Sequence, residues 1–189
     1  KPGKSKQDYG TPEEFLIAVR RRLGIEAFAW DLAATRGVNE CSPFGCYDKT
    51  DDALAGSPER WLFPGWAWLN PEFSLIGPWV ERAAAVQKLG GCLAVLVPAA
   101  VGSNWWDAHV DGIARVLLLN GRITFVGETD PYPKDCALLL YGPDVIPGYV
   151  SAWKWMDVLT EEEIEMAKQR VKKPGKSGKR ASVTAIKDG

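Results

Sequence analysis

The spacing of apolar positions predicts three long helices. In the first, apolar residues recur at helical spacing until Gly24, at Phe15, Leu16, Val19 and Leu23. Thr11 is a suitable N-cap for this helix, and Pro12 suits its first turn. A second helix is expected over residues 78–89, with an inward face formed by Val80, Ala83, Ala84 and Val86. A last helix is expected from residue 160 to about residue 171.

Uninterrupted apolar runs predict strands between these helices. They cover residues 28–33, 66–69, 92–97, 114–119, 123–126 and 136–141, with a short helix around residues 105–112. Apolar strands that alternate with helices indicate an α/β fold, in which helices cover both faces of a mainly parallel sheet. Ligands of such sheets bind beyond the carboxyl ends of the strands. Polar segments leave two predicted strands at Asp31 and Asn70, so we expect the functional site there.

The charged residues are distributed unevenly, although the formal net charge is only −1. Residues 8–167 hold 12 basic and 23 acidic residues, a net charge of −11, whereas residues 1–7 carry +3 and residues 168–189 carry +7. A near-neutral total argues against a nucleic-acid partner, but the basic ends suit one. The C-terminal run is either a flexible arm that neutralises phosphates or a solubilising tail. Its basic residues include Lys172, Lys173, Lys176, Lys179 and Arg180.

Composition divides the chain into four expected segments. These are a basic segment at residues 1–8, one folded domain at residues 9–150, a helical extension at residues 151–171 and a basic disordered tail at residues 172–189. No apolar run approaches the ~20 residues of a membrane span, and the first ten residues are too polar for a signal peptide. We therefore expect a cytoplasmic protein with no membrane partner. The sequence carries no signal for the oligomeric state.

The four cysteines are widely spaced, which favours a reduced protein over a disulfide framework. Cys92 and Cys136 lie in apolar runs and are expected to be buried core thiols. Cys41 and Cys46 share a polar loop, but zinc sites usually combine such a pair with a second pair of ligands. Because the only histidine, His109, lies far along the chain, we expect no metal site.

The segment from Asn70 to Phe73 is the most informative for function. Pro71 restricts its own backbone and that of the preceding residue, so a strand that ends on Asn-Pro has a defined exit. The Asn70 amide oxygen and the neighbouring backbone carbonyl then offer two hydrogen-bond acceptors to one group. Phe73 adds a flat aromatic face. This combination suits the amino group of a planar base.

The same segment, Asn-Pro-Glu-Phe, resembles the [Asp/Asn/Ser]-Pro-Pro-[Tyr/Phe/Trp] motif of amino-methyltransferases, which use S-adenosylmethionine. Over about residues 9–142 the chain is more specifically similar to the phage-type DNA N6-adenine methyltransferases. The segments that follow that family's order are Thr11-Pro12, Asp31-Leu32-Ala33-Ala34, Asn39-Glu40-Cys41, Asp52-Ala53-Leu54, Trp68-Leu69-Asn70-Pro71, Trp79, Val97-Pro98-Ala99, Trp105-Trp106 and Gly121-Arg122-Ile123-Thr124-Phe125.

The resemblance implies a Rossmann-like methyltransferase that acts on adenine N6 in DNA, inside a bacterial host if the chain is of phage origin. The target adenine would be flipped out of the duplex at a cost of a few kcal/mol. Asn70 and the Pro71 carbonyl would accept the N6 hydrogens, and stacking on Phe73 would return roughly 1–3 kcal/mol. Arg122 would contact a phosphate or the cofactor carboxylate, unless it forms a structural ion pair.

The resemblance also implies a site for S-adenosylmethionine. The residues it assigns to that cofactor are Thr11, Pro12, Asp31, Ala33, Ala34 and Asp52. Asp31 would lie beside the amino-acid end of the cofactor, and the two alanines would leave room for it. The Thr-Pro pair would close over the methionine part, and Asp52 would approach the adenine ring of the cofactor.

Glu72 departs from the motif, because a charged residue replaces a stiffening proline. It could loosen the acceptor geometry or place a negative charge beside a polyanionic substrate. Two alternatives therefore stay open. The acceptor could be another planar amino group, cytosine N4 or a protein glutamine, or the chain could be a catalytically impaired module that binds DNA. Most of the nine tryptophans are expected to pack in the core.

Overall fold

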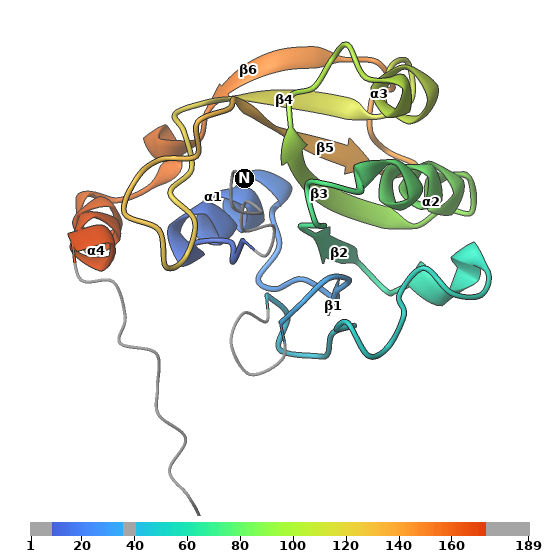
Figure 1. Ribbon diagram of the computed structural model, residues 1–189, viewed down its shortest axis with the longest axis horizontal. Coiled ribbons are helices and arrows are strands. Elements are labelled where there is room, and N and C mark those ends of the chain that lie inside the picture. Colours follow the sequence, from blue (N-terminus) through green and yellow to red (C-terminus); the bar gives the residue numbers. More distant parts are fainter. Residues whose placement is uncertain (1–8, 36–40, 173–189) are drawn as a thin grey trace, which may run out of the picture.

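A six-stranded sheet forms the centre of the computed structural model, which describes residues 9–35 and 41–172 (Figure 1). Its strands are β1 (Trp30–Asp31), β2 (Trp66–Leu69), β3 (Cys92–Pro98), β4 (Arg115–Asn120), β5 (Cys136–Tyr141) and β6 (Val150–Lys154). They lie in the order β1-β2-β3-β5-β4-β6. All strands run in one direction except β5, which is antiparallel to both of its neighbours. The mainly parallel sheet that the sequence predicts is confirmed.

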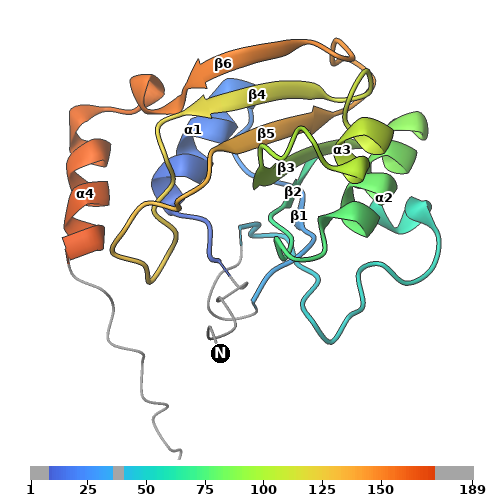
Figure 2. The ribbon, with the colours of Figure 1, turned by 45° about the horizontal axis from the view of Figure 1, so that its top comes forward.

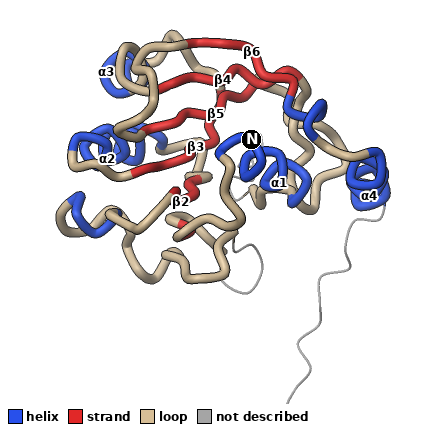
Figure 3. Tube along the Cα trace, turned by 180° about the vertical axis from the view of Figure 1, so that it is seen from behind, coloured by secondary structure: helices blue, strands red, loops and turns tan. Residues whose placement is uncertain are grey.

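Helices lie on both sides of this sheet. They are α1 (Glu13–Leu23), α2 (Ile76–Lys88), α3 (Asn104–His109) and α4 (Glu161–Lys172), with short 3-10 turns at η1 (Pro58–Trp61) and η2 (Trp155–Val158). Figures 1 and 3 show α1 on one side of the sheet and α2 with α3 on the other. In Figure 2, α4 stands at the margin of the molecule, far from α2 and α3. The arrangement is the Rossmann-like α/β fold, with helices on both faces of the sheet, that the sequence predicts.

The alternation of side chains along the strands produces two hydrophobic cores. On β3, Leu93 and Val95 face the core under α2 and α3, whereas Ala94 and Leu96 face the core under α1. Every residue of β5 is buried. A strand that is covered on both faces has no polar side, which is why the continuous apolar runs predict these strands correctly.

The helices begin close to the expected positions. The four residues predicted to face inward from α2 are all buried, and α2 begins at Ile76, two residues before the expected start. Gly24 ends α1 in a left-handed conformation, with φ of 68°. The prediction that Thr11 is the N-cap of α1 is wrong. Pro12 occupies the N-cap position and makes no side-chain capping bond, and the Thr11 hydroxyl instead accepts a hydrogen bond from Asn70.

Three predictions about strands and boundaries are corrected. The strand expected over residues 28–33 is only the two residues of β1. Residues 123–126 form no strand, because their only ladder contact is a single bridge from Val126 to Gly10. The strand β6 was not expected, since only Trp153 of its residues is buried and the others lack an apolar pattern. The sheet therefore continues past residue 150, and the helical part of the C-terminal extension begins at Glu161.

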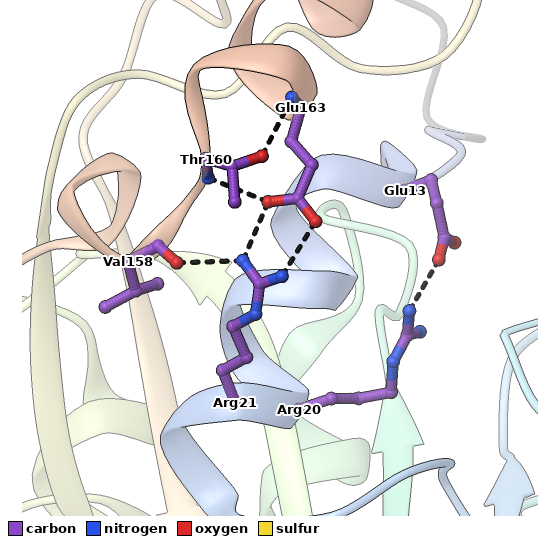
Figure 4. Close-up of polar contacts among 6 residues, drawn as sticks. All are labelled: Glu13, Arg20, Arg21, Val158, Thr160 and Glu163. Atoms are coloured by element: carbon purple, nitrogen blue, oxygen red, sulfur yellow. Dashed lines mark hydrogen bonds and ion pairs between the residues drawn. The ribbon is translucent and has the colours of Figure 1, made fainter.

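A cluster of polar contacts joins α1 to α4, and we call it the α1–α4 clamp (Figure 4). Arg21 donates to both carboxylate oxygens of Glu163, at 2.7 and 2.8 Å, and to the carbonyl of Val158 at 2.8 Å. Glu163 also accepts a bond from the backbone of Thr160, whose hydroxyl accepts one from the Glu163 backbone. The hydrogen bonds from Arg21 lower the pKa of Glu163 to about 2.

The tryptophans, Cys136 and two arginines of α1 contribute to packing or to surface contacts. All nine tryptophans are buried or pack against one of the two cores, as expected. Cys136 is buried as expected, but Cys92, the first residue of β3, is only half-buried, so the prediction that it is a buried core thiol is wrong. Arg20 pairs with Glu13 at 2.6 Å, and Arg22 lies over the Trp153 ring. Within the described ranges, no helix is both long and apolar enough to cross a membrane.

Candidate active site

A cavity of about 280 Å³ opens at the carboxyl ends of β1 and β2, the edge at which the fold predicts a site. Five parts of the chain line it: the N-terminal segment, the residues after β1, a loop over residues 48–54, the residues after β2, and the start of α2. Their lining residues are Leu32, Ala33, Ala34, Asp48, Lys49, Asp52, Ala53, Leu54, Asn70, Glu72, Leu75 and Trp79, together with Tyr9 from the N-terminal segment. The structure thus brings four predicted site residues, Ala33, Ala34, Asp52 and Asn70, to one cavity.

Asn70 leaves the end of β2 with its side-chain amide held by the N-terminal segment. Its Nδ2 donates to the backbone carbonyl of Tyr9 at 2.6 Å and to the hydroxyl of Thr11 at 3.0 Å. The amide oxygen Oδ1 is buried and has no hydrogen-bond donor among the described residues. A buried acceptor without a donor is costly, so it marks a place where a ligand can supply the missing bond.

Phe73 lies in an aromatic cluster rather than among the residues that line the cavity. Its ring centroid is 5.9 Å from that of Tyr9, 5.8 Å from that of Phe125 and 5.4 Å from that of Tyr132. Tyr9, which does line the cavity, therefore connects Phe73 to it. Pro71, which follows Asn70 in the sequence, is buried, and its ring restricts the backbone where the chain leaves β2.

Asp31 organises the loop that follows β1. It is 2% exposed, and its carboxylate accepts bonds from the backbone of Ala33 at 3.1 Å and of Cys41 at 2.9 Å. These bonds shape the segment in which Ala33 and Ala34 line the cavity, while Asp31 itself does not. Burial and then the charge of Asp31 raise the pKa of the Cys41 thiol far above its usual range.

The loop over residues 48–57 forms a wall of the cavity and is fixed mainly through its backbone. Arg82, on α2, donates to the carbonyls of all residues from 53 to 57, with the shortest contacts to Leu54 and Gly56 at 2.7 Å. Asp52, within the same loop, has a positive φ of 42°. Since a residue other than glycine rarely adopts this conformation, the loop is held by its surroundings.

The entrance of the cavity carries one ion pair and one aromatic stack. Glu72 lies 3.5 Å from the ammonium of Lys49, and both side chains are exposed. The replacement of a proline by Glu72 is thus accompanied by a cation that offsets its charge. Trp79 lines the cavity and stacks against Trp61, with ring centroids 5.8 Å apart.

Other predicted site residues do not line the cavity. Thr11 and Pro12 are buried and do not line it. Arg122 is exposed and pairs with Asp135 at 3.6 Å, the ionic alternative that the sequence left open. Lys172 is the last residue of α4. The other basic residues of the predicted tail lie outside the described residues: Lys173, Lys176, Lys179 and Arg180.

Neither the cysteines nor the acids form a metal centre in the part of the chain that the structure describes, where no group of three or more candidate ligands occurs. Sequence reasoning missed Tyr9, Asp48, Lys49, Leu54 and Leu75, which line the cavity, and Arg82, which holds its wall. Tyr9 accepts a bond through its own backbone carbonyl, and Arg82 donates to the backbone carbonyls of residues 53–57. Any residue type provides a backbone carbonyl, so such contacts leave no pattern in the sequence. The hydrophobic Leu54 had no signal besides its place in the Asp-Ala-Leu segment of the resemblance.

Comparison with known proteins supplies the family. The chain matches the family model described as DNA N-6-adenine-methyltransferase (Dam) over residues 1–137, which include Asn70 and every residue that lines the cavity. No match was found among curated proteins. The matched segment extends from the start of the chain into β5, and so contains all of the sheet except β6 and most of β5. The chain therefore belongs to the DNA N-6-adenine-methyltransferase family.

Proposed function

We propose that the protein transfers a methyl group from S-adenosylmethionine to N6 of an adenine that is flipped out of DNA, and that the cavity beside Asn70 is the reaction site. The observation that carries the proposal is the Asn70 amide oxygen, which is buried at the cavity without a donor among the described residues. An exocyclic amino group is a donor that completes this bond. Family membership supports adenine N6 as the amino group.

The Asn70 side chain would hold the amino group of the base, together with the Pro71 carbonyl. An amine that donates to two fixed acceptors has its nitrogen lone pair oriented in one direction. Alignment of reacting atoms supplies a large part of the rate enhancement in a transfer that needs no covalent intermediate. As the new N–C bond formed, the S–C bond of the donor would break and one N6 proton would leave to solvent. The positively charged nitrogen would lose this proton readily, so the proposal requires no strong base, in keeping with a chain that has one histidine.

The residues at the cavity fit S-adenosylmethionine, which supplies an electrophilic methyl group when bound. Ala33 and Ala34 have small side chains, Leu54 and Trp79 supply apolar surface, and Asp52 supplies a carboxylate for a hydroxyl or amino group of the cofactor. The cavity volume of about 280 Å³ is close to the lower end of the usual range for small-molecule sites, roughly 300–1,000 Å³. Asp31 would act by shaping the loop that carries the two alanines.

The extruded base would enter beside Tyr9 and the aromatic cluster around Phe73. Stacking of a base on an aromatic ring contributes about 1–3 kcal/mol, which offsets the cost of removing the base from the duplex. Tyr9 lines the cavity and is supported by Phe73 and Phe125 behind it. Lys49 at the entrance offsets the charge of Glu72, and this supports a functional site over an impaired one.

The test is methyl transfer from labelled S-adenosylmethionine to unmethylated DNA. We expect Asn70→Ala to lower kcat by about 100-fold or more, the scale of other losses of a fixed polar group from an active site. Asn120→Ala, at an exposed position at the end of β4, is the matched control and should retain full activity. Nucleoside analysis of the product separates N6-methyladenine from N4-methylcytosine, and a labelled protein would indicate glutamine. Equal labelling by wild type and Asn70→Ala would disprove the proposal.

A further inference from the structure

The N-terminal segment determines which atom of the Asn70 amide faces the cavity. A side-chain amide carries two N–H donors on one side and one oxygen on the other. Here the donors go to the Tyr9 carbonyl at 2.6 Å and to the Thr11 hydroxyl at 3.0 Å. With the nitrogen engaged by two acceptors, the oxygen is the atom left without a donor.

Thr11 is placed to act on Asn70 and not on the helix that it precedes. It is 3% exposed and lies 59 positions before Asn70 in the sequence, and its hydroxyl does not cap α1. It also does not line the cavity, so its side chain does not face a ligand there. We propose that Thr11 is a positioning residue, which keeps the Asn70 amide oxygen directed at the reacting amino group. This inference rests on the proposed function of Asn70.

The Tyr9 carbonyl is itself held in place by another part of the chain. The neighbouring Gly10 carbonyl accepts a bond from the backbone of Val126 at 2.9 Å. The Tyr9 ring packs against Phe125 at a centroid distance of 4.9 Å and against Tyr132 at 5.6 Å. The segment between β4 and β5 therefore supports the amide of Asn70 through Tyr9, and Thr11 provides the second point of attachment.

Loss of the Thr11 acceptor has a specific chemical consequence. Without an acceptor at Thr11, the Asn70 amide keeps only its bond to the Tyr9 carbonyl, and one buried N–H is left without a partner. An amide held at one point can rotate out of its aligned position, so its oxygen is no longer fixed on the substrate amino group. The reaction loses its aligned acceptor, whereas a cofactor bound elsewhere in the cavity keeps its contacts. The expected signature is a lower kcat with unchanged KM for S-adenosylmethionine.

The experiment compares Thr11→Val, Thr11→Ser and Thr160→Val in the full-length protein. Thr11→Val has nearly the same shape without the hydroxyl, and Thr11→Ser restores the hydroxyl. Thr160→Val is the matched control, because the Thr160 hydroxyl also accepts one hydrogen bond but lies in the α1–α4 clamp. Steady-state methyl transfer to a DNA duplex gives kcat and both KM values, and thermal unfolding shows that each variant is folded.

We expect Thr11→Val to lower kcat about 10- to 100-fold, the range for a buried group left without its partner. Its KM for S-adenosylmethionine should change less than twofold, and Thr11→Ser should recover most of kcat. A raised KM for S-adenosylmethionine with normal kcat would overturn the inference and assign Thr11 to cofactor binding. Normal kinetics of Thr11→Val would also overturn it. If Asn70→Ala is active, the proposed function itself fails, so the two failures are distinguishable.

Discussion

The polar contacts around Asn70 and the α1–α4 clamp both join segments that are far apart in the sequence, but they differ in burial and in completeness. In the clamp, Arg21 and Glu163 are paired through two bonds on an exposed surface. Around Asn70, every donor is used while one buried acceptor has no donor among the described residues. The clamp is thus a complete cluster of charged groups, whereas the Asn70 cluster is made of neutral groups and leaves one acceptor open.

The difference indicates which polar clusters hold the fold together and which prepare chemistry. Exposed ion pairs contribute little to stability, so the clamp mainly decides where α4 lies. A buried acceptor without a donor costs free energy in the folded protein. Such a cost at a cavity, next to a residue fixed by two other bonds, is typical of a site that a ligand completes.

Replacement of Asn70 by Asp should give the largest effect and tests whether the site cluster needs a donor. The amino-methyltransferase motif that this segment resembles accepts either residue, but here the Tyr9 carbonyl lies 2.6 Å from Nδ2 and would face a carboxylate oxygen instead. We expect loss of methyl transfer of about 100-fold or more, and a decrease of about 3 kcal/mol in the free energy of unfolding. Urea denaturation and initial rates measure these.

The matched control for this change is Asn120→Asp, which adds the same charge at an exposed position. It should leave both rate and stability close to those of the wild type. Full activity of Asn70→Asp would show that the site does not need an N–H donor facing the Tyr9 carbonyl. The proposed difference between the Asn70 cluster and the clamp would then be wrong.

Replacement of Arg82 by Met should give an intermediate effect, because Arg82 fixes the cavity wall without touching the reacting groups. The variant keeps most of the side-chain stem but loses the bonds to the carbonyls of residues 53–57. We expect about 1–3 kcal/mol less stability and a raised KM for S-adenosylmethionine, with kcat less affected. Arg22→Met, on the surface over Trp153, is the control. A change in kcat alone would mean that Arg82 affects the reacting groups, as Asn70 does, and not the wall of the cavity.

The clamp should give the smallest effect, and a dependence on pH. Glu163 has a pKa of about 2 in the folded protein against an ordinary value of 4.5. Because the folded pKa is the lower one, the stabilisation is present above pH 4.5 and is lost as the pH falls toward 2. The Tm difference between wild type and Glu163→Gln should therefore be small at pH 6, narrow below pH 4.5 and vanish near pH 2.

Methyl transfer at neutral pH should be the same in Glu163→Gln and in the wild type, since the clamp does not contact the cavity. A loss of activity in this variant would mean that the position of α4 affects the site, and the separation of the two clusters would be wrong.

The sequence predicted the parts of the fold that depend on local pattern. β2 and β5 have the expected bounds because their apolar runs are short and are bounded by turn residues. The reversed direction of β5 could not be predicted, since an apolar run has no direction. Ile123 and Phe125 are buried like strand residues, but no neighbouring strand pairs with them. Tertiary packing alone distinguishes such a segment from a strand.

The site was predicted to a similar extent. Asn70, Ala33, Ala34 and Asp52 were identified from motifs and do line one cavity. Asn70's partners lie 59 and 61 positions away, and one of them is a backbone carbonyl that any residue type would provide. For that reason no sequence pattern indicates that the N-terminal segment orients the amide.

The antiparallel strand β5 has a consequence for how the family can diversify. Because β4 and β5 are antiparallel neighbours, residues 121–135 leave and re-enter the sheet at the same edge, where β1 and β2 end. A parallel connection would have to cross the sheet and would be committed to packing against it. Ile123 and Phe125 pack in the core under α1, but residues 129–131 and 133–135 are exposed at this same edge. The reversal therefore leaves an exposed stretch of chain beside the cavity edge where a change of length would not disturb the pairing of the strands.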